Sequence, residues 1–258
     1  MQFLKRRLDQ LIQRRTGLSP IDRTDPNDVF IVGYPKSGNT WMQNLVAGVA
    51  FGIDPHLTSD ELINDLVLDV HYRAFYRRYA TPTFFKSHHL PRPEYRRVVY
   101  LLRDGRDTMV SYFHYLSAIK GSEPDFFKMV ALGEGLFPCR WHEHVEAWMQ
   151  NPYQSRMITI CYESLKRDPV SELRRFCEFV ELDRTDELLK SAAEACAFTA
   201  MSEREKKIGW STDVWPRDRA FVRRGKVGSF IDEMPQAVTA EFMRQARQTL
   251  IRAGYSAV

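Results

Sequence analysis

The apolar run VFIVG at residues 29–33 decides the fold, because it leads directly into YPKSGNTW at residues 34–41. Five consecutive apolar or glycine residues predict a short buried strand. After it, Trp41, Leu45 and Val49 recur at a helical spacing, and Gly52 marks a helix end. A strand, a glycine-containing turn and a hydroxyl at the start of a helix are the parts of a phosphate-binding loop.

The loop differs from an ordinary nucleoside-triphosphate loop in the position of its lysine. Gly33, Gly38 and Thr40 keep the G-x-x-x-x-G-K-[ST] frame, whereas Asn39 stands where the lysine belongs and Lys36 supplies the cation instead. Backbone N–H groups of such a turn, together with the positive end of the helix dipole, attract an anion. We therefore expect a phosphate here, but not an ordinary Mg-ATP; the alternative is a purely structural turn.

Further apolar runs alternate with helical patterns along the chain. Strands are expected at residues 29–32, 84–85, 98–102 and 157–161, and helical spacing occurs at residues 62–70, 141–148, 173–180 and 238–250. This alternation predicts an α/β fold, a P-loop-like three-layer α/β/α sandwich with a central, mainly parallel sheet. Residues 120–138 are expected to be irregular and to form a mobile lid.

Length and composition favour one domain over residues 1–258, with an N-terminal helical extension over residues 1–28. The formal charge of +4, from 37 Lys and Arg against 33 Asp and Glu, is too small for a nucleic-acid coat but suits a highly anionic small ligand. Four cysteines without C-x-x-C spacing are expected to stay reduced.

The start of the chain shows no cleavable signal, and no apolar run reaches the roughly 20 residues needed to cross a bilayer. We expect a cytoplasmic protein without stable membrane insertion. Residues 1–15 form a basic amphipathic pattern, which either packs on the body of the protein or lies on a membrane surface.

The loop at residues 34–41 resembles that of the sulfotransferases that use 3′-phosphoadenosine 5′-phosphosulfate (PAPS), which is Y-P-K-S-G-T-T-W. The match covers seven of eight positions, with Asn39 in place of a threonine. The resemblance implies that the lysine contacts the 5′-phosphosulfate, that the following residues bind the 5′-phosphate, and that the tryptophan stacks on adenine. These roles fall on Lys36, Ser37, Gly38, Asn39, Thr40 and Trp41.

A second segment, YLLRDGRDTMVSYFH at residues 100–114, resembles the part of the same family that binds the 3′-phosphate. A strand that ends in Arg103, with Ser111 near the start of the next helix, places a charged donor and a hydroxyl where both could meet one phosphate. The family positions are Arg103 and Ser111. The alternative for Arg103 is a surface ion pair with Asp104 or Asp107.

A third segment, FVRRGKVG at residues 221–228, resembles the late R-K-G-x-x-G loop of the family, which implies that Arg223, Arg224 and Gly225 bind the cofactor. The alternative is a solvated basic loop. Ser229 and Phe230 replace the usual Asp-Trp pair, so the end of this loop is expected to differ. The resemblance also suggests Tyr162 and Phe198 as aromatic neighbours of adenosine; both could instead be core residues.

The candidate base lies in FKSHHLP at residues 85–91, which resembles the family patterns K-T-H-x-P and K-S-H-L-P. Counting from Lys86 selects His88, whereas counting back from Leu90 selects His89; we prefer His88, because its distance from the strand end fixes its direction. Lys86 would serve as a second cation. His142 and His144 lack H-E-x-x-H spacing, so we expect helix-surface residues and no metal site.

The resemblance therefore implies a cytosolic-type sulfotransferase, of a bacterial-like branch, that transfers the sulfuryl group from PAPS to a hydroxyl or amine of a small-molecule, lipid or glycan acceptor. His88 would accept the acceptor proton while Lys36 stabilises the leaving phosphate, without a metal and without a nucleic-acid partner. Two alternatives stay open, a P-loop kinase or ATPase and an inactive nucleotide-binding scaffold. The acceptor and the oligomeric state are left open by the sequence.

Overall fold

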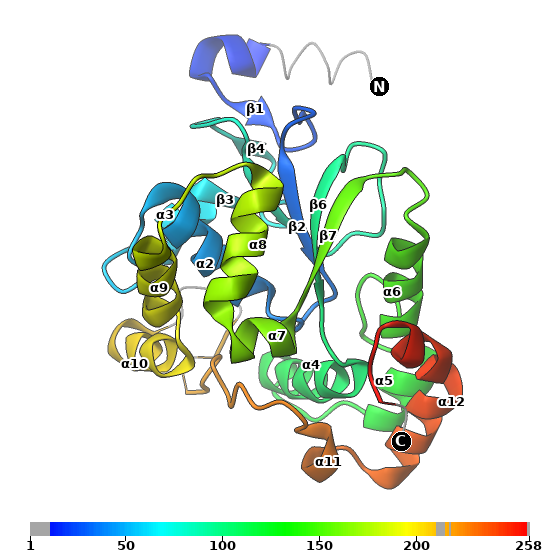
Figure 1. Cartoon of the computed structure of the whole chain (residues 1–258). Coiled ribbons are helices and arrows are strands. Elements are labelled where there is room, and N and C mark those ends of the chain that lie inside the picture. Colours follow the sequence, from blue (N-terminus) through cyan, green and yellow to red (C-terminus); the bar gives the residue numbers. More distant parts are fainter. Residues whose placement is uncertain (1–10, 210–214, 217, 257–258) are drawn as a thin grey trace.

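The computed structural model describes residues 11–209, 215–216 and 218–256. Its centre is a five-stranded sheet in which all neighbouring strands are parallel (Figure 1). In spatial order the strands are β3 (Val67–Asp69), β5 (Phe84–Ser87), β2 (Val29–Gly33), β6 (Arg97–Leu102) and β7 (Arg156–Cys161). The four strands expected from the sequence are confirmed within one or two residues at each end.

Helices cover both faces of this sheet. The alternating residues of β2 enter two separate cores: Val29 and Ile31 pack in one, Phe30 and Val32 in the other. The first core is closed by α2 (Asn39–Phe51), α3 (Asp60–Leu66), α8 (Pro169–Val180) and α9 (Asp186–Ala195). The second is closed by α4 (Gly105–Lys120), α5 (Phe126–Leu132), α6 (Trp141–Gln150) and α12 (Gln236–Arg252). The three-layer α/β/α prediction is thereby confirmed.

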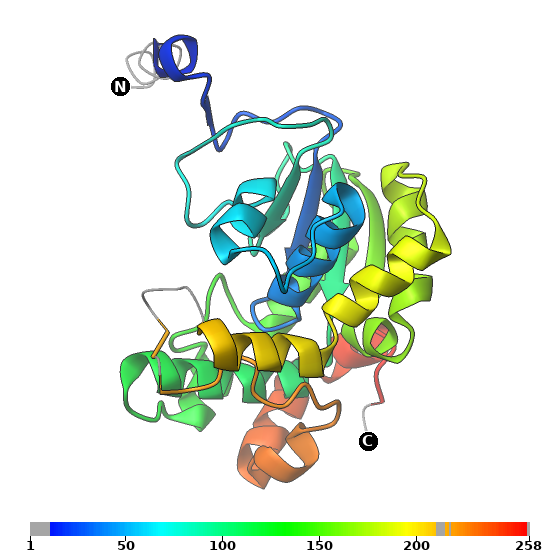
Figure 2. The same ribbon diagram turned by 90° about the vertical axis from the view of Figure 1, so that its left-hand side faces the viewer.

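The carboxyl ends of the central strands meet at one edge of the sheet. Three shorter helices and α4 gather beyond that edge in Figures 1 and 2, namely α7 (Tyr162–Arg167), α10 (Phe198–Ile208) and α11 (Phe230–Glu233). Parallel α/β folds place their ligands at this edge, because loops after neighbouring strands converge there. The candidate site segments follow strands that end here or belong to these helices, except the loop at residues 221–228, which lies between α10 and α11.

Three expectations about local structure were wrong. The helical pattern at residues 62–70 ends at Leu66, and Val67 starts β3, which pairs with β5 at the edge of the sheet. The segment 120–138 is not wholly irregular, since it contains α5, where the Asp125 side chain accepts a hydrogen bond from Lys128 N. In addition, His144 is fully buried rather than on a helix surface.

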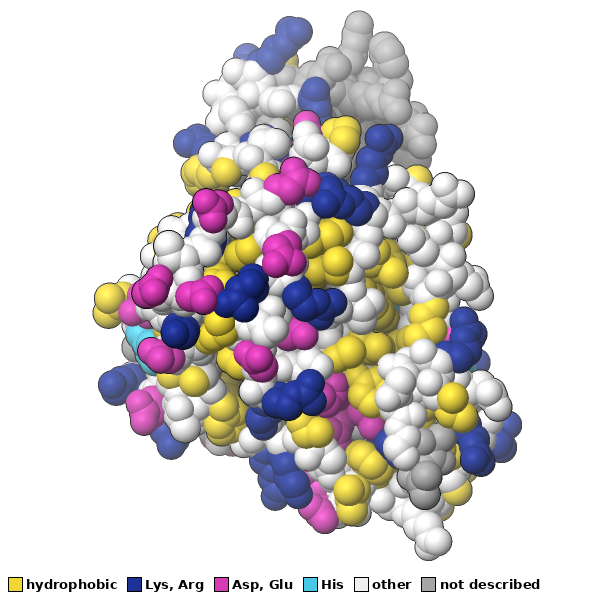
Figure 3. Space-filling model, viewed as in Figure 1, with side chains coloured by type: hydrophobic (Ala, Val, Ile, Leu, Met, Phe, Trp, Pro, Cys, Tyr) yellow, Lys and Arg dark blue, Asp and Glu magenta, His cyan; other side chains and the backbone are white. Residues whose placement is uncertain are grey.

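The N-terminal extension is described only in part. Residues 11–16 are helical and β1 (Ser19–Pro20) pairs with β4 (Phe75–Tyr76), whereas residues 1–10 of the expected basic helix lie outside the described residues. Within the described part of the chain, no helix is long and apolar enough to cross a membrane. Figure 3 shows basic and acidic side chains intermixed over the face that carries α8 and α9.

Candidate active site

The loop between β2 and α2 has a backbone that favours an anion. Lys36 and Gly38 both have positive φ angles, 72° and 94°, and the turn closes with Ser37 N donating to Tyr34 O at 3.1 Å. Gly38 is required here for space as well, because a Cβ would lie 2.8 Å from the Tyr162 ring. The Ser37 hydroxyl is buried and has no hydrogen-bond partner among the described residues.

The residues that open α2 hold the loop in place. Asn39, which departs from the family threonine, donates from Nδ2 to Tyr34 O at 2.9 Å and so braces the turn. Thr40 follows it in the first turn and is partly exposed. Trp41 donates from Nε1 to Cys196 O at 2.8 Å and meets the Tyr162 ring edge-on, with the centroids 5.6 Å apart.

Lys36 points its ammonium group into an aromatic cage. Its Nζ lies 4.6 Å from the ring centroid of Tyr115 and 4.5 Å from that of Phe221. Burial, and then the positive charges of Arg103, Lys86 and Arg223, lowers the pKa of Lys36 to about 7. The local field of several cations is what would attract a polyanionic ligand.

Arg103 leaves the end of β6 and joins two loops. One terminal nitrogen donates to Lys36 O at 3.0 Å and the other to Lys226 O at 3.4 Å, while the guanidinium lies 4.3 Å from the centroid of the Tyr162 ring. Its Nε is buried without a partner among the described residues. The proposed ion pair with Asp107 is long, 3.9 Å.

Two further polar residues, Asp104 and Ser111, lie at or near the start of α4. Asp104 pairs with Arg106 at 2.8 Å, so of the two ion pairs considered for Arg103 only the one with Asp107 occurs among the described residues. Ser111 lies in the second turn of α4 and is partly exposed.

The loop at residues 221–228 reaches the same region from the C-terminal part of the chain. Gly225 has a φ of 55°, and a Cβ there would lie 2.5 Å from the Phe198 ring, so this glycine and the start of α10 are in close contact. Arg223 and Arg224 both pair with Glu233, at 2.5 Å and 3.2 Å. The two arginines are therefore charge-paired and at the same time exposed to solvent.

The ring of His88 makes a hydrogen bond through one nitrogen and leaves the other without a partner among the described residues. Its Nδ1 lies 2.7 Å from Gly33 O, and since a carbonyl can only accept, Nδ1 carries the proton and Nε2 keeps its lone pair. Burial, followed by the nearby Lys86 charge, lowers the pKa of His88 to about 3, which keeps the ring neutral at physiological pH.

His89, by contrast, is tied to the core. Its Nδ1 lies 2.9 Å from the hydroxyl of Tyr95, and its carbonyl accepts a hydrogen bond from Trp148 Nε1 at 3.1 Å. The Tyr95 hydroxyl also meets Ser87 Oγ at 2.9 Å. These contacts hold His89 between β5 and α6, which favours His88 as the residue that faces the loop at Lys36.

Comparison with known proteins agrees with this geometry. A sulfotransferase domain model matches residues 26–254. The chain belongs to the sulfotransferase domain family. Rat sulfotransferase 1E1 is 26% identical over 246 residues, covering 84% of this chain and 81% of its own. Mouse sulfotransferase 2B1 is 30% identical over 191 residues, covering 68% of this chain and 56% of its own.

Solved structures share the fold of this sulfotransferase. Mouse sulfotransferase SULT7A1 complexed with PAP superposes with a TM-score of 0.65 at 20% identity, over 88% of this chain and 84% of that one. Retinol dehydratase in complex with androsterone and PAP gives a TM-score of 0.66 at 20% identity, over 88% and 82%. The curated relatives cited here are animal enzymes, so these comparisons do not support the bacterial-like branch expected from the sequence.

One charged residue of the site in this sulfotransferase, Asp69, was missed from the sequence. Lys86, the expected second cation, pairs with Asp69 at 2.9 Å. Burial raises the pKa of Asp69, but the charge and the hydrogen bond of Lys86, together with the backbone N–H of His71, hold that pKa below its usual range. The position of Asp69 directly opposite Lys86 in the β3–β5 register was hidden while residues 62–70 were interpreted as one helix.

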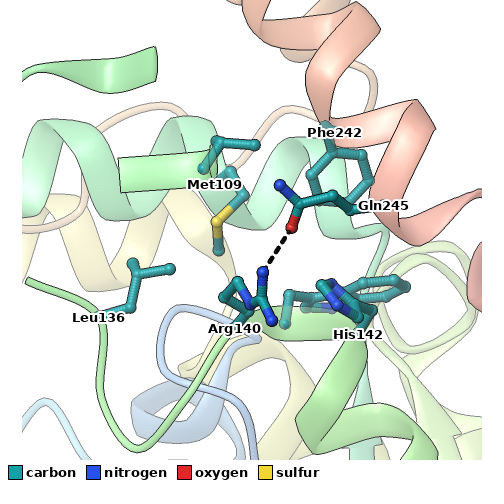
Figure 4. A pocket seen from close by; sticks show the side chains of 8 residues that line it. Met109, Leu136, Arg140, His142, Phe242 and Gln245 are labelled. Carbon is teal, nitrogen blue, oxygen red and sulfur yellow. Dashed lines mark hydrogen bonds between the residues drawn. The ribbon is translucent and has the colours of Figure 1, made fainter. Parts of the chain in front are cut away.

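Elsewhere in the sulfotransferase, a small pocket lies between α4, α6 and α12 (Figure 4). Arg140 donates to Gln245 across it at 3.0 Å. None of the candidate site residues lines this pocket. Among the described residues no group of three or more His, Cys, Asp or Glu side chains could hold a metal ion.

Proposed function

We propose that this sulfotransferase transfers the sulfuryl group of PAPS to a hydroxyl or amine of a small-molecule, lipid or glycan acceptor and leaves adenosine 3′,5′-bisphosphate (PAP). The observation that carries the proposal is the double contact of Arg103, which joins the loop at Lys36 to the loop at Lys226. Two anion-binding loops held by one guanidinium suit a ligand with a phosphate at each end.

The residues present fit such a nucleotide. Ser37 Oγ and Arg103 Nε are buried polar atoms that lack partners among the described residues, and a bound phosphate group would supply them. Residues 36–40 would bind the 5′-phosphate end of the nucleotide. The 3′-phosphate would be bound by Arg103, Ser111, Arg223, Arg224 and Gly225. Trp41, Tyr162 and Phe198 would surround the adenine.

The chemistry divides between a base and a cation. PAPS, when bound, supplies the activated sulfuryl group. His88 Nε2, the free lone pair, would accept the proton of the acceptor as it attacks. Lys36, in its ammonium form, would stabilise the negative charge that develops on the leaving phosphate. Lys86 is held by Asp69, so in this proposal it acts as part of a charge pair rather than as an independent cation.

For the acceptor, we propose an apolar or aromatic alcohol as the first candidate and a lipid or glycan head group as the second. The rings of Tyr115, Phe221 and Trp215 contact one another or Lys36, and so form an apolar wall beside the proposed transfer site. The structure of retinol dehydratase with androsterone is consistent with an apolar alcohol.

Calorimetry with PAP and with Mg-ATP tests the nucleotide part of the proposal. We expect PAP to bind tightly without metal, and Arg103→Ala to weaken it by more than about 1.5 kcal/mol, the scale of a lost charged hydrogen bond. Arg174→Ala, which removes an exposed arginine paired with Asp186 on the far helices, is the matched control. Equal affinity for the two nucleotides, or a magnesium requirement, would favour the kinase or ATPase alternative.

Transfer of labelled sulfate from PAPS to 4-nitrophenol tests the catalytic part. Lys36→Ala should abolish most transfer while the variant remains folded. A wild-type protein that binds PAP tightly but transfers nothing to phenols, steroids or cell extract would instead be the inactive scaffold.

A further inference from the structure

His71 lies beside the proposed base, although no sequence pattern marks it as a site residue. It follows β3 directly, and its backbone N–H donates to Asp69 Oδ1 at 2.9 Å. The other oxygen of the same carboxylate pairs with Lys86 at 2.9 Å. The buried Asp69 carboxylate therefore fixes where the chain turns after β3, and with it the place of His71.

The side chain of His71 then reaches the main chain of His88. His71 Nε2 lies 2.9 Å from His88 N, and a backbone N–H can only donate, so this nitrogen must be unprotonated. The proton of the neutral His71 ring consequently sits on Nδ1. Burial is the main reason that the pKa of His71 lies below its usual range, despite the opposing charge of Asp69. At neutral pH the ring can act as this acceptor.

The two rings also lie face to face. Their centroids are 5.3 Å apart and their planes differ by 15°. His88 is thus held in three ways: its backbone N–H by His71, its ring plane by the same imidazole, and its Nδ1–H by Gly33 O at 2.7 Å. The only ring position left without one of these contacts is Nε2.

We propose that His71 is a positioning residue for sulfuryl transfer, which orients the His88 ring so that its Nε2 lone pair faces the acceptor. This inference rests on the proposed function, since it takes His88 as the base. The geometry of a base matters as much as its basicity, because a proton can be taken only within hydrogen-bond reach. Phe137 packs edge-on against the His71 ring, with centroids 5.4 Å apart, and restricts the movement of that ring.

Two substitutions distinguish the effect of the hydrogen-bond acceptor atom of His71 from that of its stacking ring. His71→Gln keeps an oxygen that can accept the His88 N–H, whereas His71→Phe keeps a stacking ring without an acceptor. With PAPS and 4-nitrophenol we expect His71→Phe to lower kcat about tenfold, the scale of one lost hydrogen bond, with the KM for PAPS unchanged. His71→Gln should recover most of kcat. His56→Gln, at an exposed histidine that takes part in none of these contacts, is the control.

Three results would overturn the proposal. An unchanged kcat in His71→Phe would show that the contact does not matter for transfer. Equal losses in His71→Gln and His71→Phe would exclude the acceptor role. A rise in the KM for 4-nitrophenol at constant kcat would make His71 an acceptor contact instead. PAP affinity and Tm are measured on every variant, and a parallel fall in both would indicate a purely structural role.

A measurement independent of turnover separates this inference from the proposed function. Nitrogen-15 spectra of the imidazole rings report which nitrogen is protonated, and we expect Nδ1–H in both His71 and His88 of the wild type. In His71→Phe the His88 signals should broaden or shift toward a tautomer mixture. A sharp, unchanged His88 spectrum would contradict the positioning role. If the wild type transfers no sulfuryl group, the proposed function fails, and the spectra still decide whether His71 fixes His88.

Discussion

Asp107 accepts a hydrogen bond from the backbone N–H of Gly228 at 2.8 Å, although 121 residues separate them. The second oxygen of the same carboxylate accepts from Phe230 N at 3.0 Å. Asp107 is almost fully buried near the start of α4, so a rigid helix defines where the late basic loop ends. Ser229 and Phe230 stand where the family has an Asp-Trp pair. Because Asp107 binds backbone N–H groups of this segment, its anchoring does not depend on those side chains.

Asp107→Asn should weaken PAP binding about tenfold, because the amide keeps one acceptor oxygen but turns an NH2 group toward the second N–H donor. The loop that carries Arg223 and Arg224 would then lose part of its attachment. Calorimetry with PAP measures the loss, with the exposed Asp183→Asn as control. Unchanged affinity in Asp107→Asn would mean that the loop is positioned by other contacts.

Glu233→Gln should tighten PAP binding by about two- to fivefold at low salt. Glu233 pairs with Arg223 and Arg224 and also meets His114 at 2.9 Å, so it competes with a phosphate for the same donors. The gain is small because partly exposed ion pairs contribute little, and it should shrink as salt rises. Glu241→Gln, which breaks a comparable pair with Arg244 on α12, is the control. Weaker binding by Glu233→Gln would instead show that this carboxylate aligns the arginines.

The kcat/KM for PAPS should fall as the pH rises above about 7. Lys36 acts through its ammonium form, and its lowered pKa of about 7 means that this form is lost through that range. His88, with a pKa of about 3, is already neutral at lower pH and adds no loss there until strongly acidic conditions. Lys36→Arg stays charged and should lose the alkaline limb; persistence of that limb would assign it to another group.

His88→Ala and His89→Ala should separate catalysis from stability. Removal of His88 should lower transfer at least about a hundredfold with PAP binding intact, which is the usual contribution of a general base. Removal of His89 costs its contact with Tyr95 and should lower the unfolding free energy by about 1 kcal/mol while transfer persists. Activity assays and thermal melts distinguish the two. An inactive, stable His89→Ala variant would shift the base by one residue.

The parts of the molecule that the sequence predicted are those with strong local patterns. β2 is an unbroken apolar run, which is typical of a buried strand, and α2 repeats its apolar residues at a helical spacing. The edge strand β3 has only three residues, too few for a period of its own, and apolar Leu66 and Val67 continue the spacing of α3. Missing β3 also hid the pairing of Asp69 with Lys86 and the contact of His71 with His88.

Contacts between residues far apart in the sequence were also not predicted, because no local pattern indicates them. Asp104 makes local contacts, as the N-cap of α4 and the partner of Arg106, whereas Asp107 binds Gly228, which no local pattern indicates. In the same way, the expected surface position of His144 failed because Tyr100 on β6 supplies a buried partner 3.1 Å away. Such choices depend on which elements lie side by side.

The guanidinium of Arg103 ties the backbone carbonyls of Lys36 and Lys226 into a single unit. A substitution that displaces either segment therefore changes the surroundings of the other, so their effects on nucleotide affinity should be epistatic rather than additive. Evolution of this enzyme toward a different nucleotide would have to alter both segments together. Acceptor specificity should change more easily, because the apolar wall of Tyr115, Phe221 and Trp215 can be altered one residue at a time.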